Sequence, residues 1–247
     1  MPVEQCWGLN GALAQCRAGD IAVVHDVLSF STTVSVALDA GADVLPFAGN
    51  DEAAIVFAAQ NDAMYAARRG TPGQMTLSPL SIRSHFSHDS GTLMQQKLVL
   101  PSPNGSTRSA NLAARGIKVL TSGLRNASVI AKWLAEKHHG KVVCISAGER
   151  WPDDSLRPAV EDLMGAGMLI SEIKAISTDI ALGIDAAVAL DSYRSFAAQL
   201  VELVKSSASG RELIDAGFAD DVNIACELNE SRSVAIFDQS RKSFKLA

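Results

Sequence analysis

The chain has 247 residues, of which 47% are hydrophobic and 20% are charged, so its composition favours a globular fold and excludes general disorder. Its net charge of -5, with no cluster of Lys or Arg, argues against a nucleic-acid-binding protein, and no apolar run approaches the roughly 20 residues that span a bilayer. The N-terminal residues lack the pattern of a secretory signal, and the four cysteines show neither CxxC nor zinc-ligand spacing, which together predict a cytoplasmic protein.

Apolar, β-branched segments alternate with alanine-rich segments of helical periodicity over roughly the first 150 residues. Strands are predicted at 21–25, 44–47, 97–100, 117–121 and 142–146, and helices at 32–40, 51–69, 106–115 and 126–138. This alternation is typical of βαβ units, in which helices cover both faces of a sheet. We therefore predict an α/β fold of the three-layer α/β/α type, with a mainly parallel or mixed sheet.

The second half of the chain differs, because most of residues 155–218 has helical periodicity. A long helix is predicted over 179–204, and a strand over 233–237 is predicted to return to the sheet. Residues 70–96 are rich in Ser, Gly, Pro and His and are expected to form a long loop, a type of segment that often carries function. With no internal repeat and no convincing linker, one domain over 1–247 is favoured over two domains that divide near residue 150.

Ligands of parallel α/β sheets bind beyond the carboxyl ends of the strands, and four predicted strand ends carry polar residues. The first is Asp26, which follows strand 21–25 and precedes Ser31 and Thr32 near the start of a helix. A carboxylate in this position is a natural ligand for Mg²⁺, and the helix N-terminus can hold phosphate oxygens with its backbone N–H groups. The alternative is that these side chains only cap the helix.

The second strand end is followed by the segment Pro-Asn-Gly-Ser-Thr-Arg. Asn104 and Gly105 are typical of a turn, and Ser106 and Thr107 are expected to open a helix. Free N–H groups beside the guanidinium of Arg108 form a suitable cradle for phosphate or another oxyanion. A tight turn with a surface arginine is the alternative. The chain contains neither the P-loop nor the dinucleotide-binding pattern.

The third and fourth strand ends carry hydrogen-bonding groups. Ser122 and Asn126 follow strand 117–121, although Asn126 is equally suited to cap the next helix. Gly148 and Arg150 follow strand 142–146.

A helix after the fourth strand end carries the adjacent acidic residues Glu161 and Asp162. Adjacent helical side chains point about 100° apart, so one of the two carboxylates is expected to face the site. A solvated acidic face is the alternative. Gly165 and Gly167 indicate close packing of this helix on the sheet, because each costs roughly 1 kcal/mol relative to Ala.

Six short segments occur in a fixed order along the chain: DVLSFSTT, LSPLS, SPNGSTR, SGLRNAS, SAGER with a following ED, and GFADDVNIAC. Together they span about residues 23–238, and the series resembles the 2-phosphosulfolactate phosphatase (ComB) family. The resemblance implies a Mg²⁺-dependent phosphatase that hydrolyses 2-phosphosulfolactate to 3-sulfolactate, a step toward coenzyme M. It also implies a three-layer α/β/α fold.

The family pattern matches this chain at Asp26, Ser78-Pro79, Asn104, Gly105, Thr107, Arg108, Ser122, Asn126, Gly148, Glu161 and Asp162. Elsewhere the chain departs from the pattern. The family has Arg after Asp-Val-Leu, where this chain has Ser29, followed by Phe30 in place of a small residue. Because guanidinium groups bind phosphate and sulfonate bidentately, the change is expected to remove one positive charge from the site. The Cys of the family's Cys-Ala-Gly segment is Ser146 here.

The resulting hypothesis is a Mg²⁺-dependent phosphatase for a small phosphorylated organic acid. Asp26 with Glu161 or Asp162 is expected to hold Mg²⁺. Arg108 is expected to hold the non-bridging phosphoryl oxygens, and Arg150 a second anionic group of the substrate. The predicted catalytic residues are Asp26, Asn104, Arg108 and Glu161, the predicted metal ligands are Asp26, Glu161 and Asp162, and the predicted substrate-binding residues are Ser31, Thr32, Gly105, Ser106, Thr107, Ser122, Asn126, Gly148 and Arg150.

Two other functions fit the same sequence. The change to Ser29 is also consistent with a non-catalytic homologue that binds a small anionic metabolite, and a structural interaction protein is the third alternative. The expected partner is a small anionic phosphate ester, with neither nucleic acid nor a membrane. No pattern sets the oligomeric state, for which a homodimer is the default expectation.

Overall fold

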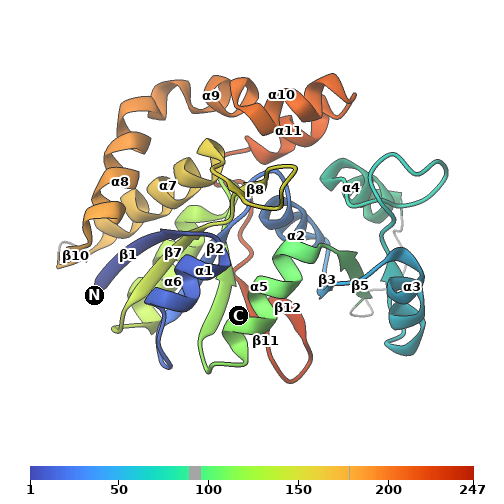
Figure 1. Cartoon of the computed structure of the whole chain (residues 1–247), viewed down its shortest axis with the longest axis horizontal. Coiled ribbons are helices and arrows are strands. Elements are labelled where there is room, and N and C mark those ends of the chain that lie inside the picture. Colours follow the sequence, from blue (N-terminus) through green and yellow to red (C-terminus); the bar gives the residue numbers. More distant parts are fainter. Residues whose placement is uncertain (89–95, 178) are drawn as a thin grey trace.

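The central strands are buried on both faces, which explains their continuous apolar sequences. In β2 (Ile21–His25), Ile21 and Val23 pack in one core and Ala22 and Val24 in another, on the opposite face of the sheet. The computed structural model describes residues 1–88, 96–177 and 179–247, except for the side chains of 88 and 103–106. Within these residues it confirms the predicted α/β fold with helices on both faces of one large mixed sheet (Figure 1).

The main sheet, as far as the structure describes it, has ten strands in the order β10-β1-β7-β2-β6-β11-β12-β3-β5-β4. Besides β2, its strands are β1 (Pro2–Trp7), β3 (Ala42–Phe47), β4 (Met64–Tyr65), β5 (Gln96–Pro101), β6 (Lys118–Thr121), β7 (Val142–Ser146), β10 (Ala181–Leu182), β11 (Ala235–Asp238) and β12 (Ser243–Leu246). A separate short hairpin consists of β8 (Glu149–Arg150) and β9 (Leu156–Arg157) and follows β7 directly.

Two groups of helices form the outer layers. One core contains side chains of α6 (Ala127–Lys137), α7 (Val160–Ile176) and α8 (Ile184–Phe196). The other contains side chains of α1 (Gly8–Gln15), α2 (Phe30–Asp39), α4 (Pro79–His88) and α5 (Pro103–Ala113). A smaller cluster packs α3 (Asp51–Gln60) on β3 and β5.

The carboxyl ends of β2 and β5 meet for a reason that the sequence does not reveal. Three antiparallel pairings, β6–β11, β11–β12 and β12–β3, separate the two parallel blocks, so β3 and β5 run opposite to β2. A twist of about 20–25° per strand accumulates to roughly 100° over the five steps from β2 to β5. The end of β5 therefore turns toward the end of β2, and Leu100, Pro101 and Asp26 line one cavity.

A helical arm crosses the end of the sheet that β2 points toward (Figure 1). It comprises the short 3₁₀ helix Ala197–Gln199, α9 (Leu200–Ser206), α10 (Ala208–Asp215) and α11 (Ala219–Ala225). Glu212 of the arm receives two hydrogen bonds from Arg157 of β9, at 2.5 and 2.8 Å. Asp221 of α11 binds the segment between β4 and α4, as described below, so the arm is tied both to the β8–β9 hairpin and to the segment that carries Arg69.

Three predicted elements are wrong in extent. The helix predicted over 51–69 ends at Gln60, because the chain turns at Asp62, which has a φ of +50°, and then forms β4 against β5. The loop predicted over 70–96 contains α4. The helix predicted over 179–204 is divided, because Ala181 and Leu182 pair with the edge strand β1 and α8 starts only after Gly183.

The two helical glycines of α7 permit two different close contacts. A Cβ on Gly165 would lie 3.0 Å from Val27, as expected for packing on the sheet side. A Cβ on Gly167 would lie only 2.2 Å from the carbonyl oxygen of Ala189 in α8. The expected close packing is thus found at both positions, but Gly167 serves helix–helix rather than helix–sheet contact.

The aromatic side chain of Phe244 joins the two halves of the sheet. It is fully buried on β12 and makes edge-to-face contacts with Phe30 and Phe237, with ring centroids 5.8 and 5.3 Å apart. Phe244→Ala should lower the free energy of unfolding by about 3–5 kcal/mol, because it removes a buried ring and leaves a cavity. Urea denaturation measures this loss. The control Phe196→Ala, at a ring that is 46% exposed, should cost much less; equal losses would contradict the central role of Phe244.

Candidate active site

Asp26 lies where β2 ends and the turn into α2 begins. Its Oδ1 accepts a hydrogen bond from the N–H of Phe30 at 3.1 Å, so the carboxylate caps the first turn of α2, where the helix dipole favours negative charge. Its own N–H donates to Ser31 Oγ at 2.9 Å. Burial raises the pKa of Asp26, while Arg108, the Phe30 N–H and Arg69 oppose this effect. The ionised form of Asp26 is therefore stabilised by nearby positive charge.

Arg108 supplies part of this charge from α5. Its side chain is 8% exposed, and its Nη2 donates a 2.9 Å hydrogen bond to the carbonyl oxygen of Ala147 after β7. Its Nη1 lies 3.7 Å from Asp26 Oδ2, and this buried nitrogen has no hydrogen-bond acceptor among the described residues. Leaving a buried charged donor unsatisfied costs on the order of 1–3 kcal/mol or more, so an anion at this point would be stabilised.

Asp162 joins the two turns that carry the site. Its Oδ1 accepts the N–H of Val27 and its Oδ2 the N–H of Gly148, both at 2.8 Å. Gly148 has a φ of +68°, and a Cβ there would lie 2.9 Å from the carbonyl oxygen of Arg157, which explains the glycine. Burial, Asp26 and Glu161 raise the pKa of Asp162 well above its ordinary value. The side chain thus acts as a clamp between the β2–α2 and β7–β8 turns.

Glu149 completes a group of neighbouring carboxylates with Asp26, Glu161 and Asp162. The pKa of Glu149 is raised to about 7, chiefly by burial. The negative charges of Asp26 and Glu161 contribute to this rise, while Arg157 and Arg108 oppose it. Glu161 is 2% exposed. Burial and neighbouring negative charge thus raise the pKa values of both Glu149 and Asp162, so this part of the site favours a bound cation.

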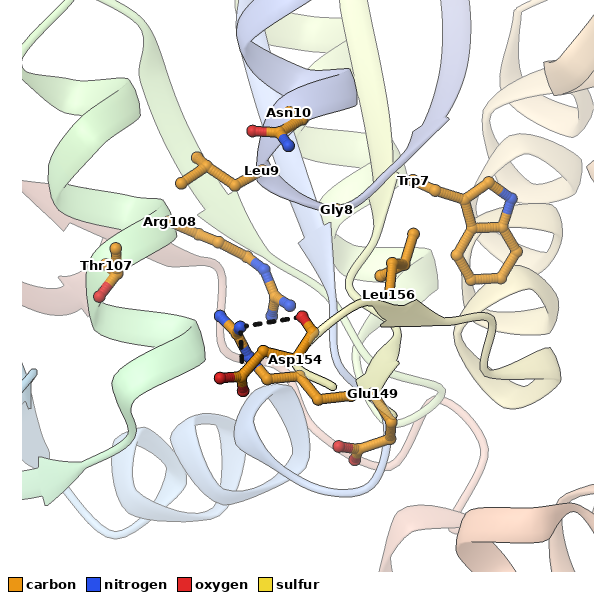
Figure 2. Close-up of a pocket in the computed structure, with 10 residues that line it drawn as sticks. Trp7, Gly8, Leu9, Asn10, Thr107, Arg108, Glu149, Asp154 and Leu156 are labelled. Carbon is orange, nitrogen blue, oxygen red and sulfur yellow. Dashed lines mark hydrogen bonds and ion pairs between the residues drawn. The ribbon is translucent and has the colours of Figure 1, made fainter. Parts of the chain in front are cut away.

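Two cavities meet at Glu149. The first, of about 250 Å³, is lined by the N-terminal turn of α1, by Thr107 and Arg108, and by the β8–β9 hairpin with Arg150. Figure 2 shows Arg108 extending from α5 into this cavity, between Leu9 and Glu149. Here Arg150 is 57% exposed and bonds Asp154 of its own hairpin. The second cavity, of about 200 Å³, contains Asp26, Ser29, Arg69 and Ser102.

A second guanidinium occupies the place where the sequence indicates a lost charge. Arg69, between β4 and α4, donates from Nη2 to Ser29 Oγ at 2.6 Å and from Nε to Asp221 Oδ2 at 2.9 Å. Its positive charge is one of those that lower the pKa of Asp26. Arg69 thus places a guanidinium beside the Ser29 side chain from 40 residues away, and its charge is paired with that of Asp221.

Several predicted substrate-binding side chains support loops instead of lining a described cavity. Ser31, Thr32, Ser122 and Asn126 are all 0% exposed. Ser31 Oγ bonds Thr121 Oγ1 at 2.6 Å, and Thr32 Oγ1 donates to the carbonyl of Val27 at 2.8 Å. Ser122 bonds the Gly123 carbonyl and Asn126 accepts the Gly123 N–H. These contacts hold the strand ends in place.

The predicted cradle at Asn104, Gly105 and Ser106 falls in the first turns of α5, but it lies among residues 103–106, whose side chains the structure does not describe. Ser78-Pro79 is placed clearly: Pro79 opens α4, and Ser78 Oγ donates to Asp221 Oδ1 at 2.5 Å.

Two residues of the site, Glu149 and Arg69, were missed as site residues by sequence reasoning. Glu149 is the first charged residue after β7, a signal that could have identified it. Arg69 was missed because the helix predicted over 51–69 is too long and placed this residue at the end of a helix.

Comparison with known proteins places the chain in a family. Residues 10–240 match the model of a family described as 2-phosphosulpholactate phosphatase. A protein of Carboxydothermus hydrogenoformans named a probable 2-phosphosulfolactate phosphatase is 31% identical over 212 residues, which cover 84% of this chain and 82% of that protein. One from Symbiobacterium thermophilum with the same name is 25% identical, covering 92% and 95%. The 2-phosphosulfolactate phosphatase of Methanothermobacter thermautotrophicus is 25% identical, covering 90% and 88%.

The raised pKa of Glu149 predicts a pH-dependent stability. Between pH 4.5 and about 7 the folded state retains a proton that the unfolded state has lost, so the stabilisation is complete below this range and disappears as pH rises through about 7. Glu149→Gln cannot ionise. Its free energy of unfolding relative to the unchanged protein should therefore rise by about 1–3 kcal/mol between pH 5 and pH 8. Urea denaturation with a chelator present measures this; a constant difference across the range would contradict the prediction.

Proposed function

Since the chain belongs to the 2-phosphosulfolactate phosphatase family, we propose that it is a Mg²⁺-dependent phosphoric monoester hydrolase for a small phosphorylated organic acid, 2-phosphosulfolactate or a related ester. The reaction breaks the ester's bond to phosphorus with water and releases an alcohol and inorganic phosphate. The expectations of a cytoplasmic location, a homodimer and a contribution to coenzyme M formation belong to this same proposal. For the described residues, no helix is long and apolar enough to span a membrane.

The observation that carries the proposal is the pairing of Arg108 with Asp26 at the end of β2. A buried guanidinium nitrogen without an acceptor requires an oxygen ligand, and a phosphoryl group offers three. Arg108 is held in position by the Ala147 carbonyl, so its remaining donors are aimed before the substrate arrives. Such preorganised donors stabilise charge that develops on phosphoryl oxygens in the transition state.

The donor set fits Mg²⁺. Carboxylate oxygens are its preferred protein ligands, and mutual repulsion among Asp26, Glu149 and Glu161 would be relieved by a divalent cation. No three His, Cys, Asp or Glu side chains in the described part of the chain converge on one metal position. That agrees with the usual manner of Mg²⁺ binding at phosphate sites, through one or two carboxylates, several waters and the substrate itself.

Each site residue has a distinct role in the proposed reaction. Asp26 and Glu161 would hold the ion, which when bound supplies positive charge to the phosphoryl oxygens. Asp162 keeps both oxygens on backbone N–H groups, so we assign it the positioning of Asp26 and Gly148. Arg108 binds and orients the phosphoryl group. The β8–β9 hairpin forms one wall of the cavity into which Arg108 extends.

The direct test is phosphate release from a panel of small phosphate esters, with Mg²⁺ and with a chelator. Turnover is expected only with Mg²⁺. Asp26→Asn should lower kcat about 100-fold or more, because it weakens the metal site and the pairing with Arg108. The matched control Asp51→Asn, at a surface carboxylate paired with Arg68, should retain normal rates.

Each alternative has its own result. A normal rate for a folded Asp26→Asn variant would remove Asp26 from the mechanism. If the folded protein releases no phosphate from any ester but is stabilised thermally by one of them, the non-catalytic binding function replaces the phosphatase.

A further inference from the structure

Arg69 is the cation of the second cavity and is fixed there from three sides. Its guanidinium lies over the ring of Phe218, 5.4 Å from the centroid, and bonds Asp221 and Ser29. Asp221 is itself 1% exposed and is held by the Ser78 hydroxyl and the Leu80 N–H. A side chain with four rotatable bonds is thus held in one orientation, while 24% of its surface stays exposed. This is the arrangement of a binding group rather than of a free surface charge.

The guanidinium retains donors for a ligand. Arginine carries five N–H groups, and Arg69 uses two of them, one on Asp221 and one on Ser29. The others meet no acceptor within the described residues. Although Asp221 balances the formal charge, its oxygens accept on the side of the helical arm, so it leaves the remaining N–H groups available.

The walls of this cavity suit a small organic acid. Beside Arg69, Ser29 and Thr33 it is lined by apolar side chains, namely Leu28, Phe30, Leu77, Leu100 and Pro101. Glu149 lines both cavities, and Asp26 lies 3.7 Å from Nη1 of Arg108, so these two carboxylates mark the end of the cavity nearer Arg108. They repel an anion, so the Arg69 end is favoured for a second anionic group.

We propose that Arg69 binds the second anionic group of the substrate, a carboxylate or sulfonate, while the phosphoryl group lies at Arg108. The inference rests on the proposed phosphatase function and narrows its substrate class to phosphate esters of small hydroxy acids. Arg69 thus takes the role that the sequence predicts for Arg150, which is to bind the second anionic group. Arg150 is more than half exposed, lies in the other cavity and bonds an exposed aspartate of its own hairpin, so it is the weaker candidate.

Two matched esters test the proposal. 2-Phospholactate carries a carboxylate, and isopropyl phosphate has a methyl group in its place. The measured quantity is the ratio of kcat/KM for the first ester to that for the second. Arg69→Gln should lower this ratio about 10–100-fold, because charge-assisted hydrogen bonds to a carboxylate are lost. 2-Phosphosulfolactate carries both acidic groups. If Arg69 binds the sulfonate, Arg69→Gln lowers kcat/KM more for this ester than for 2-phospholactate; if Arg69 binds the carboxylate, the two losses are equal.

Three variants control the experiment. Arg68→Gln removes the neighbouring arginine, which is 71% exposed and lies outside both cavities, and should leave the ratio unchanged. Arg150→Gln tests the competing position. Arg69→Gln combined with Asp221→Asn avoids an unpaired buried carboxylate, and should show the same loss of ratio with a melting temperature closer to that of the unchanged protein.

The outcomes distinguish the role of Arg69 from the phosphatase function. If Arg69→Gln changes kcat/KM equally for all three esters, or if Arg150→Gln alone lowers the ratio, the role of Arg69 is overturned while the phosphatase function stands. If the unchanged protein hydrolyses none of the three esters, the proposed function fails. Calorimetric binding of the three esters then decides on Arg69: a preference for 2-phospholactate over isopropyl phosphate, or for 2-phosphosulfolactate over 2-phospholactate, that is lost in Arg69→Gln supports its role, and equal affinities overturn it.

Discussion

One buried carboxylate holds the site together. Asp162, in the first turn of α7, accepts the N–H groups of Val27 and Gly148 and so ties the turn after β2 to the turn after β7. Arg108 adds a second tie, to the carbonyl of Ala147. Close approach of α7 at Gly165 lets the clamp reach both turns.

Charge balance then shapes what the site can bind. Burial raises the pKa values of Asp26, Glu149 and Asp162, neighbouring carboxylates raise those of Glu149 and Asp162 further, and two arginines from distant segments face them. The carboxylates at the centre of the site repel an anion that binds alone, and the two arginines repel a cation that binds alone. A metal ion and a phosphate ester with a further acidic group, bound together, balance both sets of charges.

The elements that the sequence predicts well are those whose local and tertiary preferences agree. Strands such as Ile21–His25 and Val142–Ser146 are apolar throughout because both faces are covered, and their bounds agree with the structure. The failures occur where a tertiary partner outweighs local propensity. Residues 61–69 have helix-forming composition, yet Met64 and Tyr65 pair with β5, and Ala181 and Leu182 leave a helical pattern to cover the edge of β1. Such pairings depend on a neighbour that the local sequence does not contain.

By itself, the sequence determined the α/β class, the family resemblance and the placement of Asp26, Arg108, Gly148 and Asp162 at strand ends or in the helix behind them, because these follow from short local patterns. Only the tertiary structure decided that β5, which runs opposite to β2, ends beside it, and that Arg69 lies next to Ser29. Only the tertiary structure showed that Ser31, Thr32, Ser122 and Asn126 bond the backbone of buried turns. The reason is physical: accumulated sheet twist and the crossing of a helical arm bring together residues 40 to 152 positions apart, and no local pattern records those distances.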